Sequence, residues 1–189
     1  MIIKNSEFIK SVADKKNLIS DGKNQIAFVG RSNVGKSSLI NMLTNNKKLA
    51  KTSSTPGLTK LINYFLINKE FYFVDLPGYG YAKGAKDSDF NKLIEPYFVN
   101  NNLLRCVCIL VDIRLTPNEL DKQMLEFLDY YNTPYLIIAT KSDKISNSQI
   151  YLSKTKIAKE LNINIDNVII TSNKTGFGKT ELLQKFDNM

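Results

Sequence analysis

Apolar residues fall into short runs along this 189-residue chain, and polar segments separate them. Two of the runs, residues 103–111 and 134–139, are apolar almost throughout. Such runs are typical of strands that are buried on both faces of a parallel sheet. Between them, apolar side chains recur at helical spacing and predict one packed helix face: Leu120, Met124, Phe127, Leu128 and Tyr131. The pattern therefore predicts strands that alternate with helices.

The other elements follow from shorter runs. Residues 26–29 and 168–170 predict two more parallel strands, and residues 61–67 and 71–74 predict a hairpin with a tight turn. Further helices are expected after residue 36, at 89–99, at 148–161 and up to Phe186. Pro96 is expected to bend or end the second of these. Thr116 is the expected N-cap of the helix that runs to residue 131. This order implies a three-layer α/β fold with a mostly parallel, six-stranded sheet that contains one antiparallel strand.

Length and charge limit the possible organisation. The length suits one domain, which we expect at residues 25–189, with an N-terminal extension at 1–24 packed against it. A net charge of +8 suits an anionic partner such as RNA, an acidic membrane surface or a nucleotide, but a general bias towards lysine explains it equally well. Cys106 and Cys108 are expected to be buried thiols, and no run approaches the ~20 apolar residues of a membrane span. A cytoplasmic location is therefore expected.

A phosphate-binding motif lies between the first parallel strand and the following helix. It reads Gly30-Arg31-Ser32-Asn33-Val34-Gly35-Lys36-Ser37, with Ser38 next. The glycines let backbone N–H groups converge on phosphate oxygens, Lys36 adds a positive charge, and the Ser37 hydroxyl can bind Mg²⁺. The new helix also directs the positive end of its dipole at the same anion. This motif predicts nucleotide binding.

Two more segments fit a γ-phosphate and its metal ion. Asp75-Leu76-Pro77-Gly78 follows a predicted strand, so that Asp75 can hold Mg²⁺ through water and the Gly78 N–H can reach the γ-phosphate. Gly57-Leu58-Thr59 lies in a long polar loop. Thr59 is the candidate second Mg²⁺ ligand there, with Thr55 as a rival.

Two segments near the C-terminus fit a guanine base. In Thr140-Lys141-Ser142-Asp143, the Asp143 carboxylate can accept hydrogen bonds from guanine N1–H and the 2-amino group, which adenine does not offer. The Lys141 stem can lie along the base. Backbone N–H groups of Thr171-Ser172-Asn173 can reach guanine O6, but which of them does so stays open.

With these segments assembled, the chain resembles the P-loop NTPase G domains of the translation-factor-related class, and within it the EngB family of bacterial ribosome-assembly GTPases. The segments that carry the resemblance are residues 30–38, 55–59, 61–65, 74–83, 112–114 and 140–143, together with Asp121. The resemblance implies a GTPase with Mg²⁺ that assists assembly of the large (50S) ribosomal subunit, through contact with its rRNA and proteins. It also implies GTP and GDP as ligands and a monomer without an integral membrane segment.

Catalysis is expected to depend on Lys36, Thr59, Gly78 and Asn33. Tyr79 occupies the position after Gly78 where related GTPases carry a water-orienting glutamine, and no histidine exists to replace it. Slow intrinsic hydrolysis is therefore expected, accelerated by a partner or by K⁺. In similar GTPases an asparagine at the position of Asn33 helps to hold K⁺, although this side chain could instead only stabilise the loop.

Two other functions stay open at this stage. A GTP-regulated scaffold for cell division or septation is a role also associated with the family that the chain resembles. A P-loop kinase that uses ATP is disfavoured by Asp143. Lysines flank both loops near the γ-phosphate and could contact rRNA or only water: Lys47, Lys48, Lys51, Lys60, Lys83 and Lys86.

Overall fold

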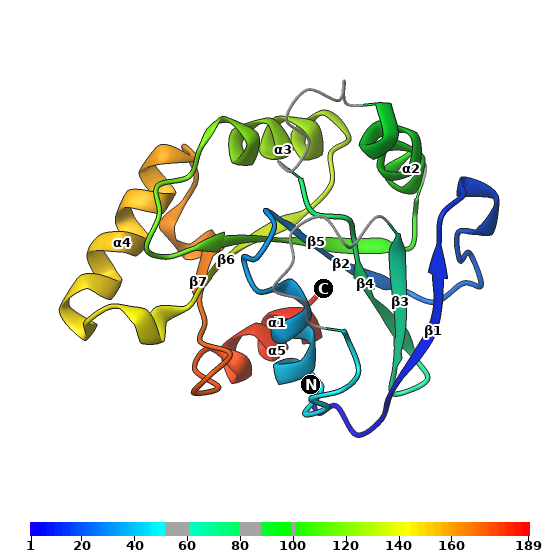
Figure 1. Ribbon diagram of the computed structural model, residues 1–189, viewed down its shortest axis with the longest axis horizontal. Helices are drawn as coiled ribbons and strands as arrows, with labels where there is room; N and C mark the ends of the chain where they lie inside the picture. The colour runs from blue at the N-terminus through cyan, green and yellow to red at the C-terminus, as the bar shows by residue number, and fades with distance from the viewer. Residues whose placement is uncertain (52–60, 80–87, 100) are drawn as a thin grey trace.

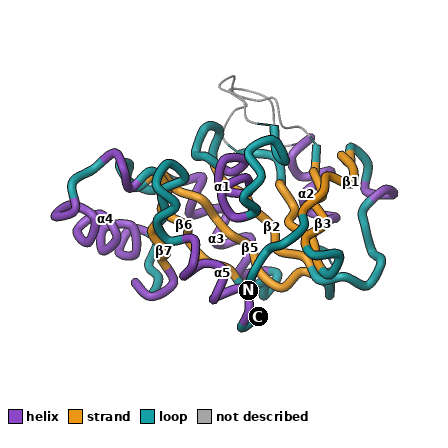
Figure 2. Tube along the Cα trace, turned by 90° about the horizontal axis from the view of Figure 1, so that it is seen from below, coloured by secondary structure: helices purple, strands orange, loops and turns teal. Residues whose placement is uncertain are grey.

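A computed structural model shows a seven-stranded sheet between two layers of helices (Figures 1 and 2). It describes residues 1–51, 61–79, 88–99 and 101–189. The strands are β1 (Ser6–Val12), β2 (Gln25–Gly30), β3 (Ile62–Ile67), β4 (Phe71–Asp75), β5 (Leu104–Asp112), β6 (Tyr135–Thr140) and β7 (Val168–Ile170). The helices are α1 (Lys36–Leu43), α2 (Ser88–Phe98), α3 (Glu119–Tyr130), α4 (Asn147–Glu160) and α5 (Lys179–Asp187). The predicted α/β fold class is confirmed.

The sheet order is β1-β3-β4-β2-β5-β6-β7, and the five strands from β4 to β7 run parallel to one another. β3 pairs antiparallel with β4 and with β1. The expected six strands become seven because β1, from the N-terminal segment, adds to the sheet edge. Its polar, largely exposed sequence does not show a strand pattern, and its paired residues in β3 lie fifty or more positions away in the chain.

Each face of the sheet has its own apolar cluster. α1 and α5 cover one face, where they pack on Phe28, Cys106 and Cys108. α2, α3 and α4 cover the other face, over Val107 and Ile109. Both cysteines are buried and free, as expected, because side chains two apart on a strand share one face.

The hairpin between β3 and β4 is confirmed. Its turn residues Asn68 and Lys69 both have positive φ, 52° and 62°, and the Glu70 N–H donates to the Ile67 carbonyl at 2.9 Å. This is the turn geometry whose twist matches that of the two strands. Asn68 also holds the chain start, because its side chain accepts hydrogen bonds from the N–H groups of Lys4 and Asn5.

One predicted helix start is wrong. Asn118, and not Thr116, caps α3: its side chain accepts from the N–H groups of Leu120 and Asp121. The Asp121 carboxylate in turn accepts from the Asn118 N–H at 2.9 Å, which completes a capping box. α2 contains Pro96 and nevertheless continues to Phe98.

The two chain ends lie close together in Figure 2, and the Met1 ammonium pairs with the Asp187 carboxylate. No helix in the described part of the chain is long and apolar enough to cross a bilayer. Because β2, β4, β5, β6 and β7 are parallel, their carboxyl ends share one edge of the sheet, and the predicted site segments follow these ends.

Candidate functional site

The loop between β2 and α1 has the backbone turn that phosphate binding needs. Gly35 lies in the left-handed region, with φ of 109°, where a side chain would be strained. Asn33 is also left-handed, with φ of 62°. The Val34 N–H closes the turn on the Arg31 carbonyl at 3.2 Å, and α1 begins at Lys36. The first turn of α1, with Ser37 and Ser38, therefore opens directly from this loop.

Lys36 and Asp75 form a buried ion pair at the centre of the site. The Lys36 Nζ lies 3.5 Å from Asp75 Oδ1, and Asp75 is 2% exposed. Burial raises the pKa of Asp75, while Lys36 and a hydrogen bond with Ser37 oppose the rise. Asp75 Oδ1 has no hydrogen-bond partner within the described residues. A hydroxyl and an unsatisfied carboxylate oxygen beside a phosphate loop are suitable donors for Mg²⁺ directly or through water.

The segment after β4 stays close to the phosphate loop. The Leu76 N–H donates to the Phe28 carbonyl at 2.9 Å, and Tyr79 forms a backbone bridge with Arg31. Gly78 therefore lies beside the loop: a Cβ at this residue would be 3.1 Å from the Gly30 carbonyl oxygen.

Tyr79 points into the core and not towards the phosphate loop's anion site. Its hydroxyl donates to Asp121 Oδ1 at 2.8 Å, and the two residues are only 7% and 2% exposed. Burial and the Asp121 carboxylate raise the pKa of the Tyr79 hydroxyl far above its ordinary range, so it stays protonated. Sequence reasoning identified the missing glutamine but not this contact with Asp121, which completes the capping box of α3.

The charged group at the end of β5 lies in a segment that carries the resemblance, but the sequence assigned it no role. Asp112 accepts from Arg114 at 2.9 and 2.7 Å and lies 3.0 Å from the Lys141 Nζ. Burial opposes ionisation, but hydrogen bonds from Arg114 and Lys141 lower the pKa of Asp112 to about 2. Lys141 also donates to the Asn33 carbonyl at 2.8 Å, so it connects the phosphate loop to the base loop. The pairing of Asp112 with Thr140 in adjacent strands brings these groups together.

The two predicted base-binding segments lie side by side. Thr140 is buried, and its hydroxyl donates to the Val34 carbonyl at 2.8 Å. The Ser142 N–H donates to the Thr171 carbonyl at 3.1 Å. Ser172 donates its hydroxyl to Asp143 Oδ1 at 2.7 Å, and this hydrogen bond lowers the pKa of Asp143. The Asp143 carboxylate is thus ionised and oriented by its neighbour.

Asn173 connects the last loop to the first. Its Nδ2 donates to the Gly35 carbonyl at 3.2 Å, and its Oδ1 is buried without a hydrogen-bond partner in the described residues. The structure therefore brings the predicted residues of β2–α1, β4, β6 and β7 to one edge of the sheet. Gly57, Leu58, Thr59 and its rival Thr55 lie outside the described residues.

Comparison with known proteins agrees with this geometry. The sequence profile of a family described as "50S ribosome-binding GTPase" matches residues 25–141. A curated relative from Clostridium acetobutylicum, "probable GTP-binding protein EngB", is 50% identical over 97% of this chain and 93% of its own length. The chain belongs to the EngB family of GTP-binding proteins. A relative from Clostridium perfringens with the same description is 49% identical over the whole chain and 98% of its own length.

Solved structures agree with the fold, and one of them is described as an EngB protein. A crystal structure of a probable GTP-binding protein EngB matches with a TM-score of 0.70 at 25% identity, over 87% of this chain and 97% of that one. A structure of Era with MgGDPNP and part of 16S ribosomal RNA matches with a TM-score of 0.66 over 86% of this chain and 55% of that one. At 23% identity, the second likeness supports the fold alone.

Proposed function

We propose that this EngB-family chain is a GTP-dependent switch that hydrolyses GTP slowly and assists assembly of the large ribosomal subunit in the cytoplasm. The observation that carries the GTP site is the meeting of three groups at one sheet edge. The Lys36–Asp75 pair suits the phosphates and metal ion, and Asp143, oriented by Ser172, suits guanine.

The nucleotide would lie along the loops that the structure brings together. Phosphate oxygens would accept from backbone N–H groups of residues 30–38 and from Lys36. The guanine edge would pair with Asp143, with backbone groups of residues 171–173 beside it. Lys141, fixed between Asp112 and the Asn33 carbonyl, would cover the base with its aliphatic stem.

Mg²⁺ fits the residues on the phosphate side. Ser37 and Thr59 would supply hydroxyl ligands and Asp75 would bind through water, which would also give Asp75 Oδ1 the hydrogen-bond partner that it lacks. When bound, Mg²⁺ neutralises charge that develops on the β- and γ-phosphate oxygens. The Gly78 N–H would approach the γ-phosphate, because its segment is held against the phosphate loop.

Two side chains support slow hydrolysis, because their polar groups are bonded within the protein. The Tyr79 hydroxyl donates to Asp121 and the Arg114 guanidinium pairs with Asp112, so neither is free to act at a γ-phosphate. We propose that a ribosomal partner or K⁺ near Asn33 supplies the missing charge. Single-turnover hydrolysis of GTP should be faster in K⁺ than in Na⁺. Equal rates in the two salts would exclude the K⁺ hypothesis, and a fast rate without any partner would exclude slow hydrolysis.

The proposed role in ribosome assembly rests on the family's description and on the basic charge of the chain. Co-sedimentation tests it: the chain with a non-hydrolysable GTP analogue should migrate with 50S particles, and the chain with GDP should migrate less. The Lys36→Ala variant, which loses the phosphate contact, provides the nucleotide-free control. Association with filaments or vesicles, and none with 50S particles, would favour the scaffold function instead.

A further inference from the structure

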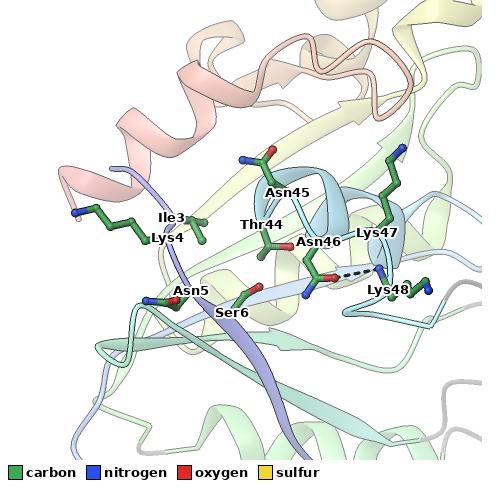
Figure 3. Close-up of a pocket in the computed structure, with 9 residues that line it drawn as sticks. All are labelled: Ile3, Lys4, Asn5, Ser6, Thr44, Asn45, Asn46, Lys47 and Lys48. Atoms are coloured by element: carbon green, nitrogen blue, oxygen red, sulfur yellow. Dashed lines mark hydrogen bonds between the residues drawn. The ribbon is translucent and has the colours of Figure 1, made fainter.

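A groove lies between the start of the chain and the end of α1, which is the opposite end of this helix from Lys36 and Ser37 (Figure 3). It has a volume of about 660 Å³, and its described lining residues are Ile3, Lys4, Asn5, Ser6, Thr44, Asn45, Asn46, Lys47 and Lys48. We call it the lysine groove. In Figure 3, Lys4 lies at one end and Lys47 and Lys48 lie at the other.

Hydrogen bonds fix the first wall. Asn68, in the β3–β4 turn, accepts from the Lys4 N–H at 2.8 Å and donates to the Ile2 carbonyl at 2.9 Å. The Asn68 N–H also donates to the Asn5 carbonyl at 2.9 Å. The chain start is thus held in place before β1 begins, and the groove does not depend on a free terminus.

The second wall is held by α1 itself. Asn41 donates to the carbonyls of Lys47 and Ala50, at 3.2 and 2.9 Å, and accepts from the Ala50 N–H at 2.8 Å. Asn41 lies on the same helix that begins with Lys36 and Ser37. One helix therefore connects the proposed phosphate site with the wall of the groove.

The charge of the groove suits an anion. The described lining includes three exposed lysines and no acidic residue, and none of the ion pairs within the described residues involves these lysines. Carbonyl groups at the end of a helix would normally oppose an anion. Here the Lys179 ammonium binds the Met42 carbonyl and Asn45 Oδ1, each at 2.6 Å, which offsets that partial negative charge.

We propose that the lysine groove binds the phosphodiester backbone of RNA. This inference rests on the proposed function, since it gives the ribosomal partner a contact site on this chain. Lysines at both ends match the repeated charge of a backbone, and the amide and hydroxyl side chains between them can bind phosphate and 2′-hydroxyl oxygens. Lysine contacts of this kind hold RNA without reading its sequence.

RNA binding by the full chain, with GDP bound, tests the groove. The probe is a fluorescein-labelled single-stranded RNA of mixed sequence, measured by anisotropy at several KCl concentrations. The test variant carries Lys47→Ala and Lys48→Ala. The control carries Lys156→Ala and Lys159→Ala, which removes the same charge from exposed positions on α4, at the other end of the sheet. GDP affinity and thermal unfolding of both variants should match the parent chain.

The loss of two phosphate contacts should make the negative slope of log K against log[salt] shallower by about 1.4 and weaken RNA binding roughly ten-fold. The α4 control should keep the parent slope and affinity. Equal weakening in both variants would show that diffuse charge binds the RNA and would overturn the proposal. No RNA binding by the parent chain, or binding only to phosphatidylserine vesicles, would overturn it too.

Co-sedimentation with 50S particles separates this proposal from the proposed function. If the parent chain and the Lys47→Ala, Lys48→Ala variant migrate with the particle equally, the proposal that the lysine groove binds RNA is wrong and the proposed function stands. If RNA binding depends on Lys47 and Lys48 but the parent chain does not migrate with 50S particles, the groove stands and the ribosomal role fails.

Discussion

Replacing Tyr79 with phenylalanine removes one buried hydroxyl and keeps the ring that packs in the core. The lost contact is the 2.8 Å hydrogen bond to Asp121 Oδ1. The carboxylate would keep the Asn118 N–H at its other oxygen, and within the described residues these two are the hydrogen bonds that it accepts. Hydrogen bonds to charged groups contribute about 1.5–3 kcal/mol, so we expect a loss of about 2 kcal/mol in the free energy of unfolding.

Urea unfolding of the GDP-bound chain measures this loss. A change of about 2 kcal/mol corresponds to a fall in melting temperature of roughly 4–8 °C for a domain of this length. Tyr130→Phe is the matched control, because Tyr130 is 78% exposed at the end of α3. Exposed substitutions of this kind change stability by less than about 0.5 kcal/mol.

A double-mutant cycle with Asp121→Asn isolates the pair. Asp121→Asn alone also weakens the capping of α3, so its total cost exceeds that of the Tyr79 contact. We expect a coupling free energy of about 1.5 kcal/mol between the two positions. Coupling near zero, or a Tyr79→Phe variant as stable as the parent chain, would refute the view that this bond holds Tyr79 in the core.

Three further predictions follow from the site. Asp112→Asn should lower the free energy of unfolding by about 1–2 kcal/mol near pH 7. This value is reduced to allow for solvent screening, because the partner Arg114 is exposed. Because folding lowers the pKa of Asp112 from 3.8 to about 2, this contribution is complete above pH ~4 and disappears as pH falls towards 2, so unfolding curves of variant and parent should converge there. Asp143→Asn should weaken the affinity for GTP by roughly 10⁴-fold and increase the affinity for xanthosine triphosphate, whose C2 carbonyl can accept a hydrogen bond from the new amide. Equilibrium binding of both nucleotides checks this prediction. Gly178→Ala should destabilise the chain strongly, since the residue has φ of 77° and the new Cβ would lie 2.0 Å from the Ile170 carbonyl oxygen. Each kcal/mol lost should lower the melting temperature by roughly 2–4 °C, so a variant that melts within about 2 °C of the parent would contradict this prediction.

The sequence predicted those helices and strands whose own residues restrict the structure locally. The run that became β5 and the hairpin turn at Asn68 and Lys69 are examples, because burial on both faces and a tight turn each restrict the residue types. β1 was not predicted as part of the sheet, since it has three consecutive exposed residues and no alternation of buried and exposed positions. The choice of Asn118 over Thr116 as a helix cap depended on Asp121, three residues later, and that spacing could have shown it.

The candidate site was also predicted in part: its segments were predicted from the sequence, and the contacts between them were not. The motifs gave the phosphate and base segments, because the backbone turns that bind a nucleotide need particular residues at short spacing. The contacts between segments could not be read from spacing. Lys141 reaches Asn33 and Asp112 only because β6 pairs beside β5, and Asn173 reaches Gly35 across most of the chain. These contacts fix where each motif lies relative to the others.

The residue after Gly78 cannot both fill the core and orient a water molecule. Tyr79 fills the core, and turning it towards the nucleotide would leave the buried Asp121 carboxylate without its donor, at a cost of roughly 1–3 kcal/mol. The inward position is therefore favoured, and the water must be oriented by another group. Arg114 is paired with Asp112 and Arg105 donates to Asn24, so neither provides that charge as the chain is folded. Asn33 is exposed, so we propose that a cation or a partner residue acts there, and hydrolysis should then respond to the ribosomal particle more than to changes at Tyr79 alone.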